Sequence, residues 1–201
     1  MSGQAHPMLD EQGLVLAPLP VEVAALRGSI RGAMLIRAGA GPRAAAATAE
    51  RVRRLPGRAV AVAGFCGALD PDVRPGDVVV ASEVIRGGGD EPRVRCPSAP
   101  LLAAELRRLG LRVHVGPVVS TDRIVRGAER QRLRRSTGAI AVDMESAWLA
   151  DSAGGRPLAV MRVVVDKAGR RFSDPRIAVD GVRALRSLRR CGLVLTEWAR
   201  E

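Results

Sequence analysis

The sequence predicts an α/β protein of three layers, α/β/α, in which a central twisted sheet, mixed but mostly parallel, lies between layers of helices. Apolar runs of strand length alternate along the chain with segments of helical period. Several of these runs are nearly continuous Val, Ala and Ile, which is typical of strands covered by helices on both faces. The length of 201 residues suits one domain, so we expect residues 13–201 to form a single domain and residues 1–12 a disordered N-terminus.

Each element follows from its own stretch of sequence. Strands are expected where short apolar runs rich in Val, Ile and Ala stand between turn residues, at 14–19, 33–39, 59–64, 77–85, 113–120, 139–142 and 157–166. Helices are expected where longer segments of helical period follow, mostly bounded by Gly or Pro, at 21–26, 43–54, 100–109, 128–136, 143–152 and 178–200. The glycine-rich segment 86–100 is predicted to be the main internal loop.

The net charge of +11 first suggests an anionic partner. The cations are nearly all Arg, with Lys167 as the one lysine, which indicates a general compositional bias rather than a local patch. Single-strand binding also uses aromatic stacking platforms, and the chain has just four large aromatic side chains. We therefore expect no nucleic-acid partner.

Cysteines and hydrophobic runs limit the class of protein further. Three cysteines, Cys66, Cys96 and Cys191, are far apart and odd in number, so they suggest reduced thiols rather than a disulfide framework or a metal site. No apolar run reaches the roughly 18 residues that span a bilayer, and the first residues lack the pattern of a signal peptide. A cytoplasmic location is expected.

Polar residues and glycine turns stand where several predicted strands end, which is where open α/β sheets bind ligands. One such end, "GAGPRA" at 39–44, matches a dinucleotide-binding turn. The next strand, however, ends in Gly64 without the acid that would hold a ribose, so we expect a plain strand-to-helix turn and no organic cofactor or metal.

Three acids stand at other strand ends. Asp143 is placed to cap the helix beside it, while Glu145 either gains from the helix dipole in the first turn or points into a crevice. Asp166 ends a Val-rich strand, where a low-dielectric surrounding favours the protonated form and suits a proton donor. The plainer interpretation is that it pairs with Lys167 or starts a turn.

Four motifs taken together, "GFCGALDPDVRPGDVVVASEV", "STDRIV", "AVDMESAWLA" and "VMRVVVDKAG", resemble the nucleoside phosphorylase and nucleosidase family, which includes purine nucleoside phosphorylase and methylthioadenosine/S-adenosylhomocysteine nucleosidase. Their order and spacing agree from about residue 14 to the C-terminus. The "GFCGALDP" turn and the "AVDMESAWLA" segment look most like the hopanoid-associated branch, which acts on adenosylhopane. The resemblance implies a nucleoside phosphorylase-like fold and cleavage of an N-glycosidic bond.

The resemblance also implies roles for individual residues. Glu145 matches the acid that holds the ribose hydroxyls, and Met144 the methionine packed against the sugar. Asp166 matches the general acid that protonates or hydrogen-bonds the purine at N7, and Glu22 the residue that activates water in the nucleosidases. Further substrate contacts are expected from the residues of the matching motifs and from one aromatic beyond them, which are Asp143, Gly64, Phe65, Cys66, Gly67, Ile124, Val125, Val165 and Phe172.

Departures from the family pattern favour water over phosphate as the nucleophile. Phe65 stands where phosphorylases carry a phosphate-binding Ser, and Val62 stands in place of a phosphate-binding Arg. Phosphate as co-substrate would then depend on Arg37 or Arg43. Val165 replaces the Ser that precedes the catalytic Asp in many relatives.

The substrate class expected from these departures is a nucleoside with a large apolar group at the 5′ carbon. Ile124 and Val125 take the place of a base-stacking aromatic, and Phe65 and Phe172 are candidates for contact with the base or a hydrocarbon tail. The basic amphipathic helix at 178–200 is expected to cover the sheet, with peripheral contact to an anionic membrane as the second interpretation. Because relatives assemble, a homo-oligomer is expected.

Overall fold

A computed structural model describes residues 12–87, 93–166 and 176–200, with the side chains of 176–179 left out. The expected disorder of the N-terminus therefore lies, up to residue 11, outside the described residues. Eight strands are described there: β1 (Gly13–Ala17), β2 (Ala33–Arg37), β3 (Val60–Ala68), β4 (Val78–Arg86), β5 (Val94–Arg95), β6 (Val113–Ser120), β7 (Ala141–Asp143) and β8 (Leu158–Asp166). The helices are α2 (Pro20–Arg27), α3 (Gly41–Arg53), α4 (Ala99–Arg108), α5 (Ala128–Thr137), α6 (Ser146–Ala150), the 3-10 turn η1 (Asp151–Ala153) and α7 (Arg176–Trp198).

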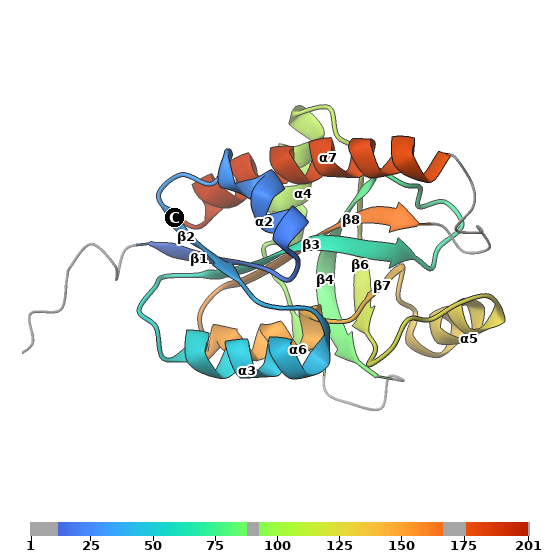
Figure 1. Cartoon of the computed structure of the whole chain (residues 1–201), viewed down its shortest axis with the longest axis horizontal. Helices are drawn as coiled ribbons and strands as arrows, with labels where there is room; N and C mark the ends of the chain where they lie inside the picture. The colour runs from blue at the N-terminus through green and yellow to red at the C-terminus, as the bar shows by residue number, and fades with distance from the viewer. Residues whose placement is uncertain (1–11, 88–92, 167–175, 201) are drawn as a thin grey trace, which may run out of the picture.

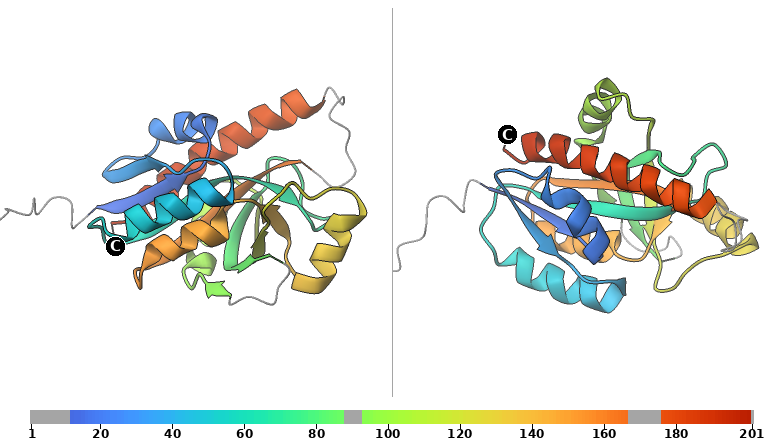
Figure 2. Two further views of the ribbon diagram at one scale, coloured as in Figure 1. Left: turned by 60° about the horizontal axis from the view of Figure 1, so that its bottom comes forward. Right: turned by 45° about the horizontal axis from the view of Figure 1, so that its top comes forward.

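The sheet is mixed and mostly parallel, as predicted. Strands β3, β8, β4, β6 and β7 pair in turn, and β7 returns to β3, so these five close into a ring. Strands β1 and β2 extend the ring from β3, and the short β5 pairs with β4. Helices α2, α4 and α7 lie on one side of the sheet and α3 and α6 on the other, with α5 at one end (Figure 1). The same arrangement is seen in the two rotated views of Figure 2.

Burial on both faces explains the near-continuous apolar strands. In β1, Val15 and Ala17 join a core cluster with α4 and α7, while Leu14 and Leu16 join a second cluster with α3 and α6. Successive side chains of a strand point to opposite faces, so a strand between two helical layers is buried at every position. All five residues of β1 are accordingly buried.

Two predicted helices differ from the observed ones. The helix expected from residue 143 begins at Ser146, because Asp143 still pairs as a strand residue with Ser120 of β6. The helix expected at 178–200 is α7, which begins at Arg176 and ends at Trp198. It buries Leu188 and Val194 against the sheet and leaves Val182 47% exposed.

A register shift in the pairing of β3 with β8 shapes the end of the sheet. It falls between Cys66 and Gly67, and it sets Gly67 opposite Asp166. Irregularities of this kind turn a strand and re-aim its side chains. The shift therefore brings the last residue of β8 against a position without a side chain.

Candidate active site

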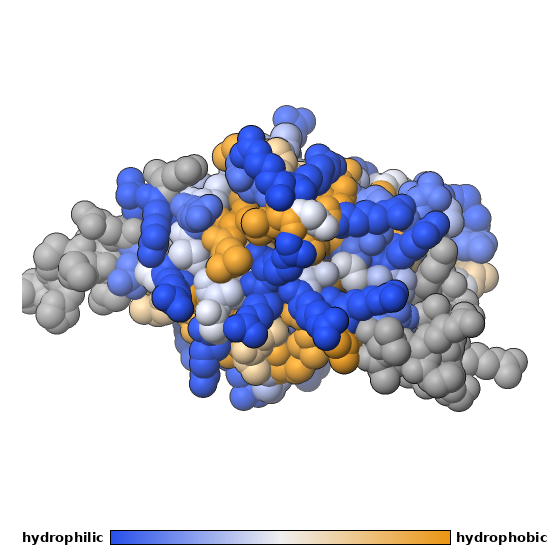
Figure 3. All heavy atoms as spheres, turned by 90° about the horizontal axis from the view of Figure 1, so that it is seen from above, coloured by the Kyte–Doolittle hydropathy of each residue, from blue (hydrophilic) through white to orange (hydrophobic). Residues whose placement is uncertain are grey.

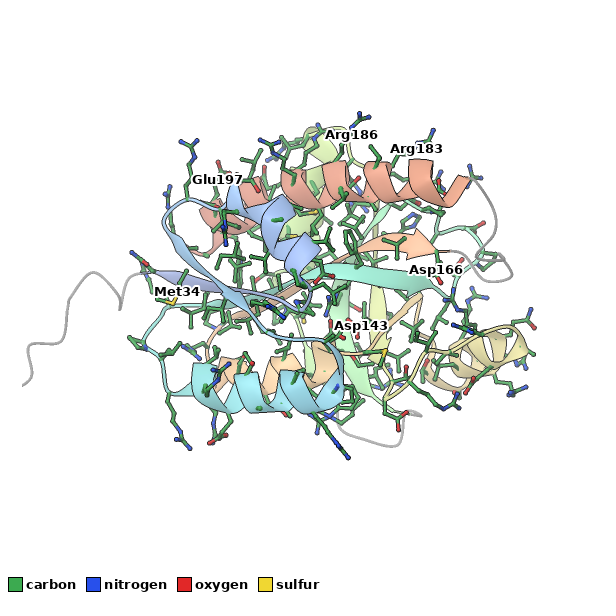
Figure 4. The ribbon with its side chains drawn as sticks, in the orientation of Figure 1. Met34, Asp143, Asp166, Arg183, Arg186 and Glu197 are labelled. Atoms are coloured by element: carbon green, nitrogen blue, oxygen red, sulfur yellow. The ribbon has the colours of Figure 1, made fainter. Side chains whose placement is uncertain are left out.

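A cavity of about 300 Å³ opens where β3, β7 and β8 end. Its lining comes from segments that are far apart in the sequence. Of the residues predicted to form the site, those that line it are Phe65, Cys66, Gly67, Ile124, Val125, Asp143, Met144, Glu145, Val165 and Asp166. Figure 4 shows Asp143 and Asp166 toward the same end of the sheet, whereas Arg183 and Arg186 project from α7.

Glu145 stands just before α6 and is 9% exposed. Its Oε1 accepts a hydrogen bond of 2.8 Å from the backbone N–H of Gly41, the first residue of α3. The turn leading into α3 needs positive φ at Gly39 (85°) and Gly41 (79°), which glycine adopts without strain. Burial raises the pKa of Glu145. The Arg162 guanidinium and the N-terminus of α3 both favour the anion and oppose this rise, but burial outweighs them.

Glu22 is buried in α2, with 1% of its surface exposed. Its Oε1 accepts from the backbone N–H of Phe65 at 2.6 Å and its Oε2 from that of Leu19 at 2.6 Å, so two segments hold the carboxyl in place. Burial raises its pKa, against the opposing effect of the Arg162 guanidinium. A carboxyl with a raised pKa is a stronger base than an exposed glutamate.

Gly64 makes room for this arrangement. A Cβ at that position would lie 2.5 Å from Oε1 of Glu22 and 2.5 Å from Nη1 of Arg162. Contacts below 3.0 Å do not occur for a real Cβ, so any side chain would displace one of the two. The absence of a side chain at Gly64 therefore leaves the room that Glu22 and Arg162 occupy.

The carboxylate of Asp143 is bound by other groups of the protein. Its carboxylate accepts from the Ser120 hydroxyl and from the backbone and hydroxyl of Ser146, and it forms an ion pair with Arg162 at 2.7 Å. The Asp143 side chain is 1% exposed. Its cap interaction with Ser146 agrees with the predicted capping role, although the helix starts later than expected.

Arg162 of β8 is a functional candidate that the sequence reasoning missed. It is fully buried, with Nε donating to Ser146 and paired with Asp143. Within the described part of the chain, Nη1 and Nη2 have no hydrogen-bond acceptor. The signal in the sequence was a lone charged residue inside the apolar run "PLAVMRVVVD", because a charge is buried in such a strand only when it is paired.

Asp166 ends β8 and forms an ion pair of 2.5 Å with Arg130 of α5. Its side chain is 49% exposed, so the desolvation expected from its Val-rich strand is wrong: the strand is buried, but its last residue emerges beside the cavity. Arg130 itself is another residue that the sequence reasoning missed. No signal set it apart from the other arginines of "AERQRLRR".

Other predicted residues lie elsewhere. Arg37 and Arg43, the two arginines expected to recruit phosphate, are exposed and do not line the cavity. Phe172 falls outside the described residues. Cys66 is buried, and burial raises the pKa of its thiol, which makes it an unreactive part of the wall. In the part of the chain that the structure covers, no group of three or more His, Cys, Asp or Glu side chains is arranged to hold a metal ion.

Two predicted site residues, Glu22 and Gly64, are buried and do not line the cavity, whereas Asp143 and Glu145 do. The arrangement therefore supplies negative charge at the cavity wall, with Glu22 held against the backbone of Phe65. The acidic groups of Asp143, Glu145 and Glu22 all act electrostatically on the buried guanidinium of Arg162, so acids outnumber the arginine where a developing cation would be stabilised. The Asp166–Arg130 pair also lines the cavity, together with apolar side chains such as Leu19 and Val165.

Comparisons with known proteins agree with this geometry. A family model described as "Phosphorylase superfamily" matches residues 20–194. Comparison with curated protein sequences finds no significant match.

Solved structures with the same fold include two methylthioadenosine/S-adenosylhomocysteine nucleosidases. The one from Campylobacter jejuni has a TM-score of 0.78 at 16% identity, covering 94% of this chain and 98% of that one. The one from Neisseria meningitidis, in complex with methylthio-immucillin-A, has a TM-score of 0.74 at 21% identity, covering 94% and 99%. The futalosine hydrolase of Helicobacter pylori has a TM-score of 0.75 at 16% identity, covering 93% and 98%. At these identities the structural likeness shows the fold alone, and it confirms the predicted fold class.

Proposed function

Because the chain belongs to the phosphorylase superfamily, we propose that it cleaves the N-glycosidic bond of a 5′-substituted adenosine and releases adenine. The observation that carries this proposal is the convergence of Glu22 and Glu145 on one buried guanidinium beside the cavity that Asp166 also lines. Cleaving such a bond builds positive charge on the sugar and negative charge on the leaving base. A site for this reaction needs carboxylates at the sugar and hydrogen-bonding groups at the base.

At the sugar, Glu145 is the group proposed to hold the ribose hydroxyls, with Met144 against the ring. The backbone N–H of Gly41 fixes the orientation of the Glu145 carboxyl. A carboxylate so held accepts hydrogen bonds from hydroxyls and stabilises the cation that forms beside it. Asp143 acts behind it, by holding Arg162.

At the nucleophile, Glu22 is the proposed base. Its raised pKa suits it to take a proton from water. Phosphate is a weaker candidate nucleophile, since Arg37 and Arg43 lie off the cavity. We therefore favour hydrolysis over phosphorolysis.

The apolar walls support a bulky apolar 5′ substituent. Leu19, Phe65, Ile124 and Val165 line the cavity, and Ile124 is 59% exposed, which places an apolar side chain at its opening. Adenosylhopane is the substrate proposed first, giving ribosylhopane in hopanoid biosynthesis, or its 1-phosphate if phosphate attacks.

Methylthioadenosine and S-adenosylhomocysteine are the second candidates, because the Campylobacter and Neisseria neighbours are named as nucleosidases for them. A lipid-linked substrate would be reached from a membrane surface, so we also propose peripheral contact with anionic lipid. Assembly into a homo-oligomer is proposed separately, from the family resemblance. No helix in the described residues is both long and apolar enough to cross a bilayer.

The face that carries α7 bears on the membrane proposal. Figure 3 shows hydrophilic side chains spread across this face with an apolar area between them. Exposed apolar side chains of α4 and α7 are Leu101, Val182 and Leu193. Such a mixed face can rest on a lipid surface by weak attraction.

The decisive experiment incubates the protein with adenosylhopane and with methylthioadenosine, each with and without phosphate, and identifies base and sugar products by mass. Free ribosyl product in both buffers selects hydrolysis, whereas a 1-phosphate formed with phosphate alone selects phosphorolysis. Glu22→Gln and Glu145→Gln are expected to lower kcat by about 10²–10⁴-fold. Glu50→Gln, on the exposed side of α3, is the matched control and should keep full activity.

Two outcomes would count against the proposal. Undiminished turnover in both glutamine variants would remove the assigned roles. Absence of adenine release from every adenosine derivative, together with retained binding of nucleotides, nucleic acid or anionic vesicles, would favour a non-catalytic basic binding protein with this fold.

A further inference from the structure

Another cavity, of about 320 Å³, lies beside the N-terminal half of α7. Its wall consists of the turn 75–77, residues 110–112 and three residues of α7, which are Arg183, Arg186 and Ser187. None of its lining residues lines the active-site cavity. It is therefore a separate place at which this chain can bind a ligand.

Close packing of α7 against the turn 75–77 forms this cavity. Gly76 has a φ of 89°, and a Cβ there would lie only 3.3 Å from the Cβ of Arg183. The hydroxyl of Ser187 donates to the carbonyl of Gly76 at 2.8 Å. These contacts fix one turn of the helix over the loop, so that the side chains of Arg183 and Arg186 begin at the cavity wall.

The cavity wall carries more positive than negative charge. Three arginines and one aspartate line it, and three minus one gives a net charge of +2. The aspartate, Asp77, is 6% exposed, and its Oδ2 already lies 3.2 Å from Nε of Arg112 and 2.9 Å from Nε2 of His114. Arg183 and Arg186 are exposed and form no ion pair or hydrogen bond within the described part of the chain. Their two charges are therefore available to an anion.

A phosphate group is the anion that suits two such arginines. Side chains three positions apart on a helix are neighbours, and like charges on neighbouring positions destabilise the helix. An anion held between Arg183 and Arg186 removes that repulsion. Planar guanidinium groups donate paired hydrogen bonds to phosphate oxygens, and these are stronger than hydrogen bonds between neutral groups. The cavity, at about 320 Å³, has room for one such group.

The surroundings of the cavity indicate that a membrane lipid carries this phosphate. Between residues 181 and 196, the sequence of α7 holds four arginines and no acid. Val182 and Leu193 are 47% and 49% exposed, and their spacing of four and seven positions from Arg186 places all three on one face of the helix. Figure 3 shows an apolar area among hydrophilic side chains on the face seen from above. Exposed apolar side chains between arginines are typical of helices that lie on anionic membranes.

We propose that this cavity binds the phosphate of an anionic phospholipid, with Arg183 and Arg186 as donors and Val182 against the lipid surface. The inference deepens the membrane contact put forward above, and it rests on the proposed function for the reason why the protein meets a membrane. Helix α7 packs against β8, and Figure 4 shows both arginines above Asp166, on the half of α7 that lies over the end of that strand. A lipid bound there holds the active-site end of the sheet at the membrane surface.

The test measures binding of the full chain to lipid vesicles by sedimentation. One set of vesicles contains equal parts of phosphatidylglycerol and phosphatidylcholine, and the other contains phosphatidylcholine alone. The cavity variant is Arg183→Gln/Arg186→Gln. The matched control is Arg27→Gln/Arg189→Gln, which removes the same charge from exposed arginines of α2 and α7 that do not line the cavity.

The unaltered protein is expected to bind the vesicles that contain phosphatidylglycerol and not to bind those without it. Diffuse attraction to the membrane supplies up to about fivefold in the partition coefficient per arginine, so the control should lose no more than this for each substitution. The cavity variant should lose at least about tenfold more than the control, as when hydrogen bonds to a charged group are removed. Both variants should keep their circular dichroism signal and their rate of adenine release from methylthioadenosine, because neither changes a residue of the active-site cavity.

Soluble glycerol 3-phosphate distinguishes a lipid from a free phosphate ester as the ligand. It carries a phosphate without acyl chains, so calorimetry should detect its binding only at millimolar concentration or above. Binding of glycerol 3-phosphate at micromolar concentration that is lost in the cavity variant, together with equal vesicle binding by this variant and the control, would overturn the lipid as the ligand of this cavity.

Equal losses of vesicle binding in the cavity variant and the control would overturn the inference, because surface charge alone would then explain the binding. Absence of binding to either kind of vesicle by the unaltered protein would overturn it as well, and would leave the proposed cleavage intact. Cavity-dependent binding by a protein that releases adenine from no nucleoside would support this site and remove the proposed function.

Discussion

Replacing Gly64 with alanine tests whether the open space beside Glu22 is required. The added methyl would lie 2.8 Å from Cδ of Glu22 and 2.5 Å from Nη1 of Arg162. Carbon atoms pack at about 3.5–4.0 Å, so the carboxyl must move by roughly 1 Å. Such a shift takes Oε1 out of hydrogen-bond range of the Phe65 N–H, which it now meets at 2.6 Å.

The magnitude follows from these contacts. Overpacking of a tight interior costs about 1–3 kcal/mol, and a lost hydrogen bond to a charged group about 1.5–3 kcal/mol. We expect Gly64→Ala to lower the free energy of unfolding by about 3–5 kcal/mol. A displacement of roughly 1 Å in a positioned base should lower kcat about 10²-fold in the protein that still folds.

The assay combines urea unfolding with adenine release. Gly181→Ala is the matched control: this glycine lies in α7, nothing within 4 Å would meet its Cβ, and alanine is the better helix former, so the change should stabilise by up to about 1 kcal/mol. Gly64→Ala with unchanged unfolding and full kcat would refute the reasoning, because Glu22 would then not occupy the space that the glycine leaves.

The pH dependence, the buried ion pair and the thiols give further tests. Burial raises the pKa of Glu22 above 4.5, so the base becomes protonated at a pH above 4.5. We expect kcat/KM to fall as the pH drops through this pKa. A profile in which kcat/KM falls only at or below pH 4.5 would contradict the assignment. Arg162→Met leaves the buried Asp143 carboxylate without its cation and should cost about 3–5 kcal/mol in urea unfolding, and a cost under about 1 kcal/mol would show that the pair is dispensable. Burial raises the pKa of every cysteine, to about 12 for Cys96 and Cys191, so a disulfide reagent at pH 8 should label none in the native protein and three in urea. Rapid native labelling would mean that these thiols are accessible.

Much of the fold was predictable because it depends on periodicity. The runs of Val, Ala and Ile became strands buried on both faces, and the segments 65–67, 143–145 and 165–166 meet at one cavity. What escaped prediction depends on tertiary pairing. The start of α6 could not be placed, because Asp143 is held in β7 by its pairing with Ser120, and no local signal shows a pairing across 23 residues.

Arg162 and Arg130 were not predicted as site residues, because their partners lie in other segments of the chain. Arg162 was visible as a charge in an apolar strand, but its partners Asp143 and Ser146 come from another segment. Arg130 is one of several arginines in a polar helix, and only the fold shows that this one points inward. Helix periodicity cannot separate a buried arginine from its exposed neighbours when both faces of the segment are charged.

The hydrogen bonds that hold the two glutamates have a consequence for how activity appears during folding. Glu22 is held by a residue 43 positions away and Glu145 by one 104 positions away, so neither carboxyl is oriented until segments distant in the chain have docked. Contacts of such long sequence separation form slowly, because loop closure must precede them. In a refolding experiment, enzymatic activity should therefore recover more slowly than the helical circular dichroism signal. The difference between the two rates would measure how long the distant segments take to dock.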